Sequence, residues 1–568
     1  MHMLRLRLLV DYRTEPIVEK RFRILAHISN QLRKHVKKQL SRLEKDRVYQ
    51  ELKKEYGRLK KLDPDNHEEV AADLSRVSGL MDETINELGL TKSGLEKYAS
   101  VMQRRYKKNI SSHQVQAEVA HILKGLEKVL YGDGKDIHYK KERDFTTIPG
   151  KSCSNGVILH FDQDDEKHEV NCYITWNGIT IPVRYDLSKA DLPGGRNYVN
   201  ESLSSGKICY CEIKRIWFRS GYKYYVDIYM KGEAPKKVEP GKSVMGIDEG
   251  TSTVAAVSGD AVFLEELAPQ CVDYNKEITK LQRQIDVSTR KTNPDKFKED
   301  GTCRKRSEWK EKHWTFSKNC LRKKARLREL YRRKSAYAKC RHENLLNRMI
   351  QSASSFVNEP MEFSALAKRS KKTERQDKLS EVKKKDGSVK TVRKYKRKKR
   401  FGKSVNDRSP GLFQTRLKQK CVQYGLAYME TDKWKYRASQ YDHDLDAYIK
   451  VELSRRFKTV AGQVVQRDLY SAFLQSCMGT PEKPDREKCL QLFGQFVRMQ
   501  AELIMKMKAS GDSHVRHALD SDKRQILPEY PVNHRFPENM LIRPQGAEAT
   551  PSVASTGHRP LVCDPSKA

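Results

Sequence analysis

Three short segments, far apart in the sequence, each carry an acidic residue where the chain is predicted to change direction. They are residues 244–250 (VMGIDEG), 356–363 (FVNEPMEF) and 443–447 (HDLDA), and their candidate acids are Asp248, Glu359 and Asp444. Carboxylate oxygens suit hard divalent ions such as Mg²⁺, and in-line cleavage of a phosphodiester uses two such ions about 4 Å apart. If folding gathers these segments, they form a two-metal nuclease site.

The first two acids each end a predicted strand. Residues 243–247 are apolar, Asp248 ends them, and a second apolar run at 253–257 completes a predicted hairpin. The glycine that follows at position 250 lets backbone and substrate approach closely. Glu359 ends a predicted strand at 355–359. A turn aspartate and a helix-capping glutamate are the structural alternatives for these two positions.

The third acid is the least determined of the set. Asp444 stands where a helix that contains Val451, Leu453 and Phe457 is predicted to begin, and a carboxylate is favourable at a helix N-terminus. Asp442, Asp446 and Asp468 compete with it, because the spacing does not show whether one of them replaces or assists Asp444. On a helix, Asp446 would point about 200° away from Asp444, so only one of these two could face a shared metal pair.

The charge of the chain indicates a polyanionic partner. The 568 residues contain 112 Lys and Arg against 74 Asp and Glu, a formal net charge of +38, and the sequence pI is about 9.6 with a mean hydropathy of −0.80. Lys and Arg neutralise phosphates and release counterions, so this excess favours nucleic acid. No segment approaches the roughly 20 apolar residues of a membrane span, and the N-terminus lacks a signal-peptide core, which predicts a cytoplasmic protein without a membrane partner.

The order of helix-like and strand-like segments along the chain predicts an α+β multidomain protein. An alternating strand at 4–10 is followed by long basic helices, and short β segments begin near residue 146. We expect a β-barrel that contains the first strand and is interrupted by a helical lobe, followed by an α/β nuclease domain. The predicted divisions are 1–14 (first barrel strand), 15–142 (helical lobe), 143–240 (barrel), 241–510 (nuclease domain, with a helical insertion at 265–350 and a basic insertion at 367–410) and 511–568 (disordered tail).

Two basic segments are candidate nucleic-acid contacts. Residues 368–403 are rich in Lys and Arg and too one-signed to be expected to fold unaided, and a helix predicted from about 317 to 348 has a cationic face. A plain solvated surface and a nuclear-import signal are the alternatives. The proposed contacts are Lys368, Arg369, Lys371, Lys372, Lys394, Lys396, Arg397, Lys398, Lys399 and Arg400 in the first segment, and Arg322, Lys323 and Lys324 in the second.

The motifs in this order resemble the RuvC nuclease of TnpB proteins, the transposon-encoded relatives of type V CRISPR effectors. The resemblance is carried by Gly-Ile-Asp-x-Gly at 246–250, Glu-x-Met-x-Phe at 359–363 with Leu366 and Arg369 after it, and Ser-Gln at 439–440 followed by Asp-x-Asp-Ala at 444–447. It is densest from about residue 243 to 473. The first strand, helical lobe and barrel resemble the wedge and recognition lobes of that family. The length of the chain leaves open a type V effector or an intermediate between the two groups.

The resemblance implies an RNA-guided DNA endonuclease with an RNase H-like (RuvC) fold. Asp248, Glu359 and Asp444 would then hold two Mg²⁺ ions, with Mn²⁺ as a substitute, and the partners would be a guide RNA and double-stranded target DNA with a flanking motif. Many TnpB chains carry a zinc ribbon of paired Cys-x-x-Cys after the Ser-Gln element. Here residues 441–443 contain no cysteine, and none of the twelve cysteines forms a Cys-x-x-Cys pair, so we expect no zinc.

Two other functions fit part of the pattern. One is a guide-directed DNA-binding protein that does not cut, against which the three acids argue. The other is an RNA-free resolvase or transposase of the RuvC type, against which the size of the predicted recognition region argues. The oligomeric state, the guide architecture and the cleavage of collateral single strands are left open.

Overall fold

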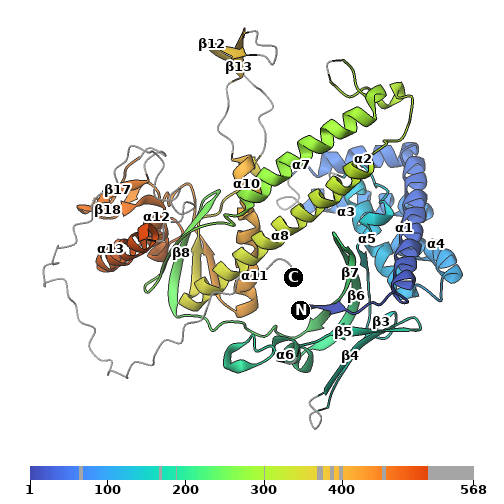
Figure 1. Cartoon of the computed structure of the whole chain (residues 1–568), viewed down its shortest axis with the longest axis horizontal. Coiled ribbons are helices and arrows are strands. Elements are labelled where there is room, and N and C mark those ends of the chain that lie inside the picture. The colour runs from blue at the N-terminus through green and yellow to red at the C-terminus, as the bar shows by residue number, and fades with distance from the viewer. Residues whose placement is uncertain are drawn as a thin grey trace. The chain divides into compact units, whose positions relative to one another are not determined.

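The computed structural model describes residues 1–62, 68–132, 134–164, 169–186, 188–299, 301–367, 375–383, 389–395, 401–450 and 456–509. The chain forms two compact units, Met1–Lys237 and Val238–Ala568 (Figure 1). Their boundary lies close to the predicted division at residue 240. Both units mix helices with sheets. In the described part of the chain, no helix is both long enough and apolar enough to cross a membrane.

The first unit is built on a seven-stranded sheet in the order β2-β6-β7-β1-β5-β4-β3. The first strand of the chain lies in its middle and pairs antiparallel with both β7 and β5. This placement confirms that the N-terminal strand joins a sheet formed by much later segments. The strands are β1 (His2–Leu8), β2 (Thr147–Ile148), β3 (Val157–Asp164), β4 (Glu169–Trp176), β5 (Ile179–Arg184), β6 (Lys207–Phe218) and β7 (Gly221–Lys231).

Within the described residues, the five α-helices α1 to α5 lie between β1 and β2, and a short sixth α-helix precedes β6. The first turn of α5 has the capping box expected of a helix start, because Ser111 Oγ accepts from the Gln114 backbone N–H and the Gln114 side chain accepts from the Ser111 backbone N–H. The helices are α1 (Glu15–Leu43), α2 (Arg47–Leu59), α3 (Glu68–Glu87), α4 (Lys92–Arg105), α5 (Ser112–Leu130) and α6 (Tyr198–Ser205).

One hydrophobic core runs through the helices and the sheet of this unit. It joins Phe22 and Leu32 of α1 to Trp176 and Val226 of the strands, so the predicted helical lobe and barrel share their interior. The strand β3 also lies beside β6, which curls the sheet. No hydrogen-bonded ladder between β2 and β3 closes the sheet within the described residues, and a closed barrel therefore stays a prediction.

The second unit is built on a five-stranded sheet in the order β10-β9-β8-β11-β14. The predicted hairpin is confirmed, since β8 pairs antiparallel with β9 and β9 continues antiparallel to β10. The strands β11 and β14 are parallel to β8 and β11 respectively. The bounds are β8 (Ser243–Glu249), β9 (Thr253–Val257), β10 (Val262–Glu266), β11 (Ala353–Asn358) and β14 (Ala427–Glu430).

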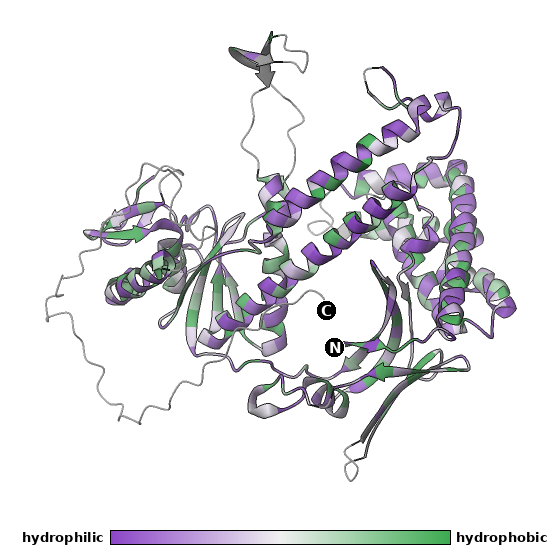
Figure 2. Ribbon diagram, viewed as in Figure 1, coloured by the Kyte–Doolittle hydropathy of each residue, from purple (hydrophilic) through white to green (hydrophobic). Residues whose placement is uncertain are grey.

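Helices cover both faces of this sheet. Met245 and Ile247 pack against α8 (Lys318–Ser352) and α11 (Pro410–Tyr424) on one face. Ala255 and Val257 pack against α12 (Arg467–Ser476) and α13 (Arg486–Ala509) on the other. The alternation along each strand is why neighbouring residues enter different cores, and in Figure 2 these strands are mainly hydrophobic.

The predicted helical insertion is an antiparallel pair formed by α7 (Cys271–Thr292) and α8. The Ser317 side chain caps α8 by accepting from the Cys320 backbone N–H, 3.1 Å away. The two helices meet through a short apolar contact that includes Ile278, Leu281 and Leu330. Most of the residues along these two helices are hydrophilic in Figure 2.

The basic segment at 368–403 contains a folded element that sequence reasoning did not expect. The strands β12 (Arg375–Lys383) and β13 (Val389–Tyr395) pair as an antiparallel hairpin. It is flanked by α9 (Phe363–Ala367) and α10 (Gly402–Arg408). Three further two-stranded hairpins follow β14, formed by β15 (Tyr441–Asp442) with β16 (Ala447–Tyr448), β17 (Phe457–Val460) with β18 (Gln463–Gln466), and β19 (Met478–Thr480) with β20 (Lys483–Pro484).

Candidate active site

The carboxyl ends of three adjacent parallel strands define one edge of the five-stranded sheet. Asp248 lies at the end of β8, Glu359 directly follows β11, and Thr431 directly follows β14. Thr431 N donates to Asn358 O at 3.1 Å, so the chain that leaves β14 stays beside the residue that precedes Glu359. Such an edge is where open α/β sheets place their ligands.

A glycine brings the helix α12 directly onto this edge. A Cβ atom at Gly246 would lie 2.0 Å from Ala472 O and 2.3 Å from Ser476 N, so no larger residue fits without moving α12. Gly246 and Asp248 face the same side of β8 because strand side chains alternate. The carboxylate of Asp248 therefore points toward the helix, whose first turn carries Asp468.

Three carboxylates converge at this point. Burial raises the pKa of the Asp248 carboxyl well above its usual range, and the negative charges of Asp468 and Glu359 raise that pKa further. Arg467 and a hydrogen bond from Ser471 oppose the effect. Burial also raises the pKa of Glu359, which Lys433 partly offsets. The site thus gathers carboxyl groups whose charges repel one another, and a bound cation would relieve that repulsion.

Two arginines hold the third carboxylate. Arg456 Nη1 donates to Asp468 Oδ2 at 3.3 Å, and Arg467 Nη2 donates to Asp468 Oδ1 at 3.2 Å. The Arg456, Arg467 and Asp468 side chains are all mostly buried. The guanidinium groups therefore balance part of the negative charge contributed by Asp468.

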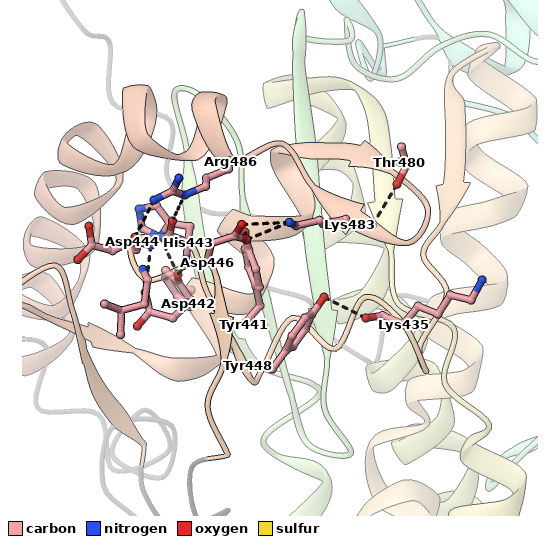
Figure 3. A network of polar contacts seen from close by, with 12 residues as sticks. Lys435, Tyr441, Asp442, His443, Asp444, Asp446, Tyr448, Thr480, Lys483 and Arg486 are labelled. Atoms are coloured by element: carbon pink, nitrogen blue, oxygen red, sulfur yellow. Dashed lines mark hydrogen bonds and ion pairs between the residues drawn. The ribbon is translucent and has the colours of Figure 1, made fainter.

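Asp444 lies elsewhere. It is exposed in the turn of the β15–β16 hairpin, where its backbone carbonyl accepts from Arg486 Nη2 at 2.9 Å (Figure 3). Its neighbours Asp442 and Asp446 belong to the same hairpin, and Asp446 pairs with Lys483. The structure thus brings Asp468, one of the three competing acids, to Asp248 and Glu359 in place of Asp444.

The turn around Asp444 has the side-chain hydrogen bonds of a helix N-cap, although no helix directly follows it in the described residues. Asp442 Oδ1 accepts from the backbone N–H groups of Asp444 and Leu445, at 3.0 and 3.4 Å, as a capping aspartate would. This turn leads into the strand β16, and Phe457 begins β17, so the predicted helix is wrong over these residues. Residues 451–455 lie outside the described part.

The sequence of α12, the helix that carries Asp468, contains a cap residue and apolar residues at helical spacing. The Gln466 side chain accepts from Leu469 N at 2.6 Å and caps α12. Leu469, Tyr470, Phe473 and Leu474 then follow at helical spacing and are all buried. This spacing is much more regular than that of the apolar residues after Asp444, and it would have favoured Asp468.

The next residue on β8 is also a carboxylic acid, on the opposite face. Glu249 is 1 % exposed, and neither of its side-chain oxygens has a hydrogen-bond partner among the described residues. Burial, with a smaller contribution from the charge of Asp248, raises the pKa of Glu249 to about 8. Glu249 is therefore mainly protonated at neutral pH. It does not join the metal-binding set because it lies on the face of β8 opposite to α12 and Asp468.

Four of the predicted nucleic-acid contacts lie in described elements. Lys394 lies on β13, and Arg322, Lys323 and Lys324 lie on α8. Lys324 Nζ lies 3.0 Å from the centre of the Phe316 ring. The other predicted contacts lie outside the described residues: Lys368, Arg369, Lys371, Lys372, Lys396, Arg397, Lys398, Lys399 and Arg400.

The three carboxylates are suitable ligands for a divalent ion, but in this structure their oxygens are not arranged around a single point. Across the described ranges, no three His, Cys, Asp or Glu side chains are placed to hold a metal ion. Asp468 is turned toward its arginines. Carboxylate oxygens are the ligands that Mg²⁺ prefers, and its charge would offset the repulsion that Asp468 and Glu359 exert on Asp248. Asp468 would have to exchange its arginine partners for the ion.

Comparisons with known proteins found distant structural similarities. No protein-family model matches the chain, and no curated protein matches it. A Cas12f1–sgRNA–target DNA complex is 13% identical over 83% of this chain and 97% of the other, with a TM-score of 0.39. A CRISPR-Cas12f ternary complex is 13% identical over 84% and 99%, with a TM-score of 0.23. Both TM-scores are below 0.5, so neither similarity assigns a fold or a function to this chain.

Proposed function

We propose that this chain is an RNA-guided, divalent-metal-dependent DNA endonuclease whose metal-binding carboxylates are Asp248, Glu359 and Asp468. The observation that carries the proposal is the convergence of three acids from separate elements, β8, the end of β11 and the first turn of α12, with the charges of two of them raising the pKa of the third.

The sheet supports an RNase H-like assignment of the second unit. Numbered along the chain, its strands have the order 3-2-1-4-5, and only the second strand is antiparallel to the others. This is the arrangement of RNase H-like domains, whose first acid ends the central strand. The RuvC resemblance of the sequence motifs points to the same fold.

The chemistry follows from the carboxylates. Two Mg²⁺ ions, when bound, would activate the attacking water and stabilise the leaving oxygen of the phosphodiester. Asp248, Glu359 and Asp468 would hold these ions through their carboxylate oxygens. Lys433, whose charge acts on Glu359, would attract the nucleic-acid backbone.

The guide RNA and the DNA target rest on the TnpB resemblance and on the charge of the chain. A net charge of +38 provides the cationic surface that a long polyanion needs. In such a system base pairing with the guide selects the sequence, while the protein binds backbone shape and a short flanking motif. The transposon or CRISPR origin of the guide belongs to the same proposal.

A cleavage assay with the full chain tests this function. The protein is purified with the RNA that it binds in cells, the RNA is sequenced, and target DNA matched to it is offered with a randomised flank. We expect cleavage that needs both Mg²⁺ and the RNA, and loss of cleavage in Asp248→Ala with RNA and target binding retained. Cleavage of branched DNA without RNA would instead indicate a resolvase, and cleavage by Asp248→Ala would overturn the site.

A further inference from the structure

A turn beside the three acids carries a tryptophan that the proposed chemistry does not use. Residues 432–436 leave the sheet at the end of β14, next to Glu359. Thr431 N, directly before this turn, donates to Asn358 O at 3.1 Å, and Asn358 directly precedes Glu359. The turn that carries Lys433 and Trp434 therefore leaves the sheet at the same edge as the acid site.

The turn is rigidly fixed. Asp432 Oδ1 accepts from the backbone N–H groups of Trp434 and Lys435 at 2.8 and 3.2 Å. Asp432 N donates to Pro481 O at 2.7 Å, and Tyr436 N donates to Asp432 O at 2.8 Å. A turn with this many bonds holds its side chains in place, and its conformation does not depend on where the indole of Trp434 lies.

Further anchors tie the turn to the second unit on both sides. Tyr436 is 1 % exposed, and its hydroxyl donates to Leu474 O of α12 at 2.6 Å. Lys435 pairs with Glu482 through its side chain, and its backbone carbonyl accepts from the Tyr448 hydroxyl at 3.1 Å (Figure 3). The turn is thus bound to the same helix that carries Asp468.

Trp434 is nevertheless open to solvent. Of the five tryptophans in the chain, all within the described residues, it is the one that is exposed, at 78%. Lys433 Nζ lies 5.3 Å from the centre of its ring. A single exposed apolar side chain is ordinary, but an exposed aromatic ring beside a cation combines base stacking with phosphate contact, as in sites that bind single-stranded nucleic acid.

We propose that Trp434 stacks on an unpaired base of the strand whose phosphodiester lies at Asp248, Glu359 and Asp468, while Lys433 contacts a neighbouring phosphate. This inference rests on the proposed nuclease function and adds a residue that positions the strand. A base within a duplex is already stacked on both faces, so the indole selects single-stranded polynucleotide. Stacking tolerates any base, and Trp434 would therefore fix the position of the strand and leave its sequence to other contacts.

The binding test uses full-length protein in EDTA, where no metal-dependent cleavage occurs. Short single-stranded DNA oligonucleotides are titrated while tryptophan fluorescence is followed. We expect quenching by the single strand, removal of that quenching in Trp434→Phe, and an affinity about tenfold weaker in Trp434→Ala, with Phe retaining most of the affinity. Duplex binding is expected to be unchanged. Equal quenching and equal affinity in all three proteins would overturn the inference, as would quenching by duplex alone.

A matched control separates stacking from a general loss of apolar surface. Leu445→Ala removes a side chain that is 64% exposed in the same unit, and it is expected to bind single strands as the unchanged protein does. Thermal melting of Trp434→Ala should match the parent because the indole is hardly buried. A parallel loss of affinity in Leu445→Ala would contradict a specific role of the indole.

A cleavage experiment with the same variants distinguishes failure of this inference from failure of the proposed function. If the protein cleaves, Trp434→Ala is expected to raise KM about tenfold and to spread the cut over neighbouring positions, and Trp434→Phe is expected to restore both. Cleavage with an unchanged KM and cut position in Trp434→Ala would overturn the inference and leave the function standing. Quenching that depends on Trp434 in a protein that never cleaves would support the stacking site and overturn the function.

Discussion

Asp248 and Glu249 are neighbours in the sequence, but their carboxyl groups lie in different surroundings. A strand directs successive side chains to opposite faces, so Asp248 meets Glu359 and Asp468 while Glu249 is buried without a hydrogen-bond partner in the described structure. The sequence could show that two acids end the strand. It could not show which one faces the other carboxylates, because that depends on which side of the sheet α12 covers.

The pKa of Glu249 predicts how stability changes with pH. Its carboxyl has a pKa of about 8 in the folded chain against 4.5 for an unperturbed glutamate. Between these values the folded state holds a proton that the unfolded state has lost, so stability falls by about 1.4 kcal/mol per pH unit as pH rises, and the fall ends above pH 8. Glu249→Gln removes this dependence.

Denaturant unfolding of the full chain in EDTA at pH 5 to 9 checks this prediction. Glu249→Gln should be more stable than the parent by a margin that grows from pH 5 to about pH 8 and then stays constant. Glu299→Gln, at an exposed glutamate of the same unit, is the matched control and should follow the parent at every pH. A constant margin for Glu249→Gln across the range would contradict a buried protonated carboxyl.

At the scale of elements, the contact between β8 and α12 positions Asp468. Gly246→Ala would place a methyl group 2.0 Å from Ala472 O, and α12 would have to shift. Overpacking of this kind costs about 2 kcal/mol. A displacement of about 1 Å at catalytic groups lowers rates roughly 100-fold. We therefore expect Gly246→Ala to fold with reduced stability and to lose most cleavage, as measured by thermal melting and by single-turnover rates.

Gly494→Ala in α13 is the control for this substitution. No atom lies within 4 Å of the Cβ that it would add, and alanine is favoured over glycine in a helix by up to about 1 kcal/mol. It should melt at or above the temperature of the parent and cleave normally. Normal cleavage by Gly246→Ala would show that α12 need not sit directly on β8.

Elements with strong local signals could be predicted, and those that depend on partners could not. The hairpin of β8 and β9 and the helix before Gly425, which ends α11 with a φ of 69°, were recognised from apolar runs and a stop residue. The β15–β16 hairpin was mistaken for a helix start because its Asp442 turn uses the hydrogen bonds of a helix cap. The β12–β13 hairpin is not predicted, because the excess of Lys and Arg in residues 368–403 indicates an unfolded segment and hides the pattern of two pairing strands.

At the scale of the whole molecule, the excess of cations predicts salt-dependent binding. Replacing Lys396, Arg397, Lys398, Lys399 and Arg400 with Gln should weaken nucleic-acid affinity at every sequence and flatten the dependence of log Kd on log salt. Fluorescence anisotropy at several salt concentrations measures both effects. An unchanged slope would mean that this segment makes no phosphate contacts.

A second variant with the same change in net charge controls for general electrostatics. It neutralises five cations that already pair with acids: Arg58, Arg76, Arg196, Lys276 and Arg290. Since these side chains are engaged with carboxylates, their loss should change the salt slope less than the loss of the basic segment. An equal change in both variants would show that net charge alone sets the affinity.

The central claim is that Asp468 completes the metal site with Asp248 and Glu359. The most direct test compares Asp468→Asn with Asp444→Asn, using calorimetric titration with Mn²⁺ or Mg²⁺ and cleavage of guide-matched DNA. Asp468→Asn should lose tight metal binding and cleavage while keeping the fold, and Asp444→Asn should retain both, because Asp444 is exposed in a separate hairpin. Loss of metal binding in Asp444→Asn with full activity in Asp468→Asn would contradict the account.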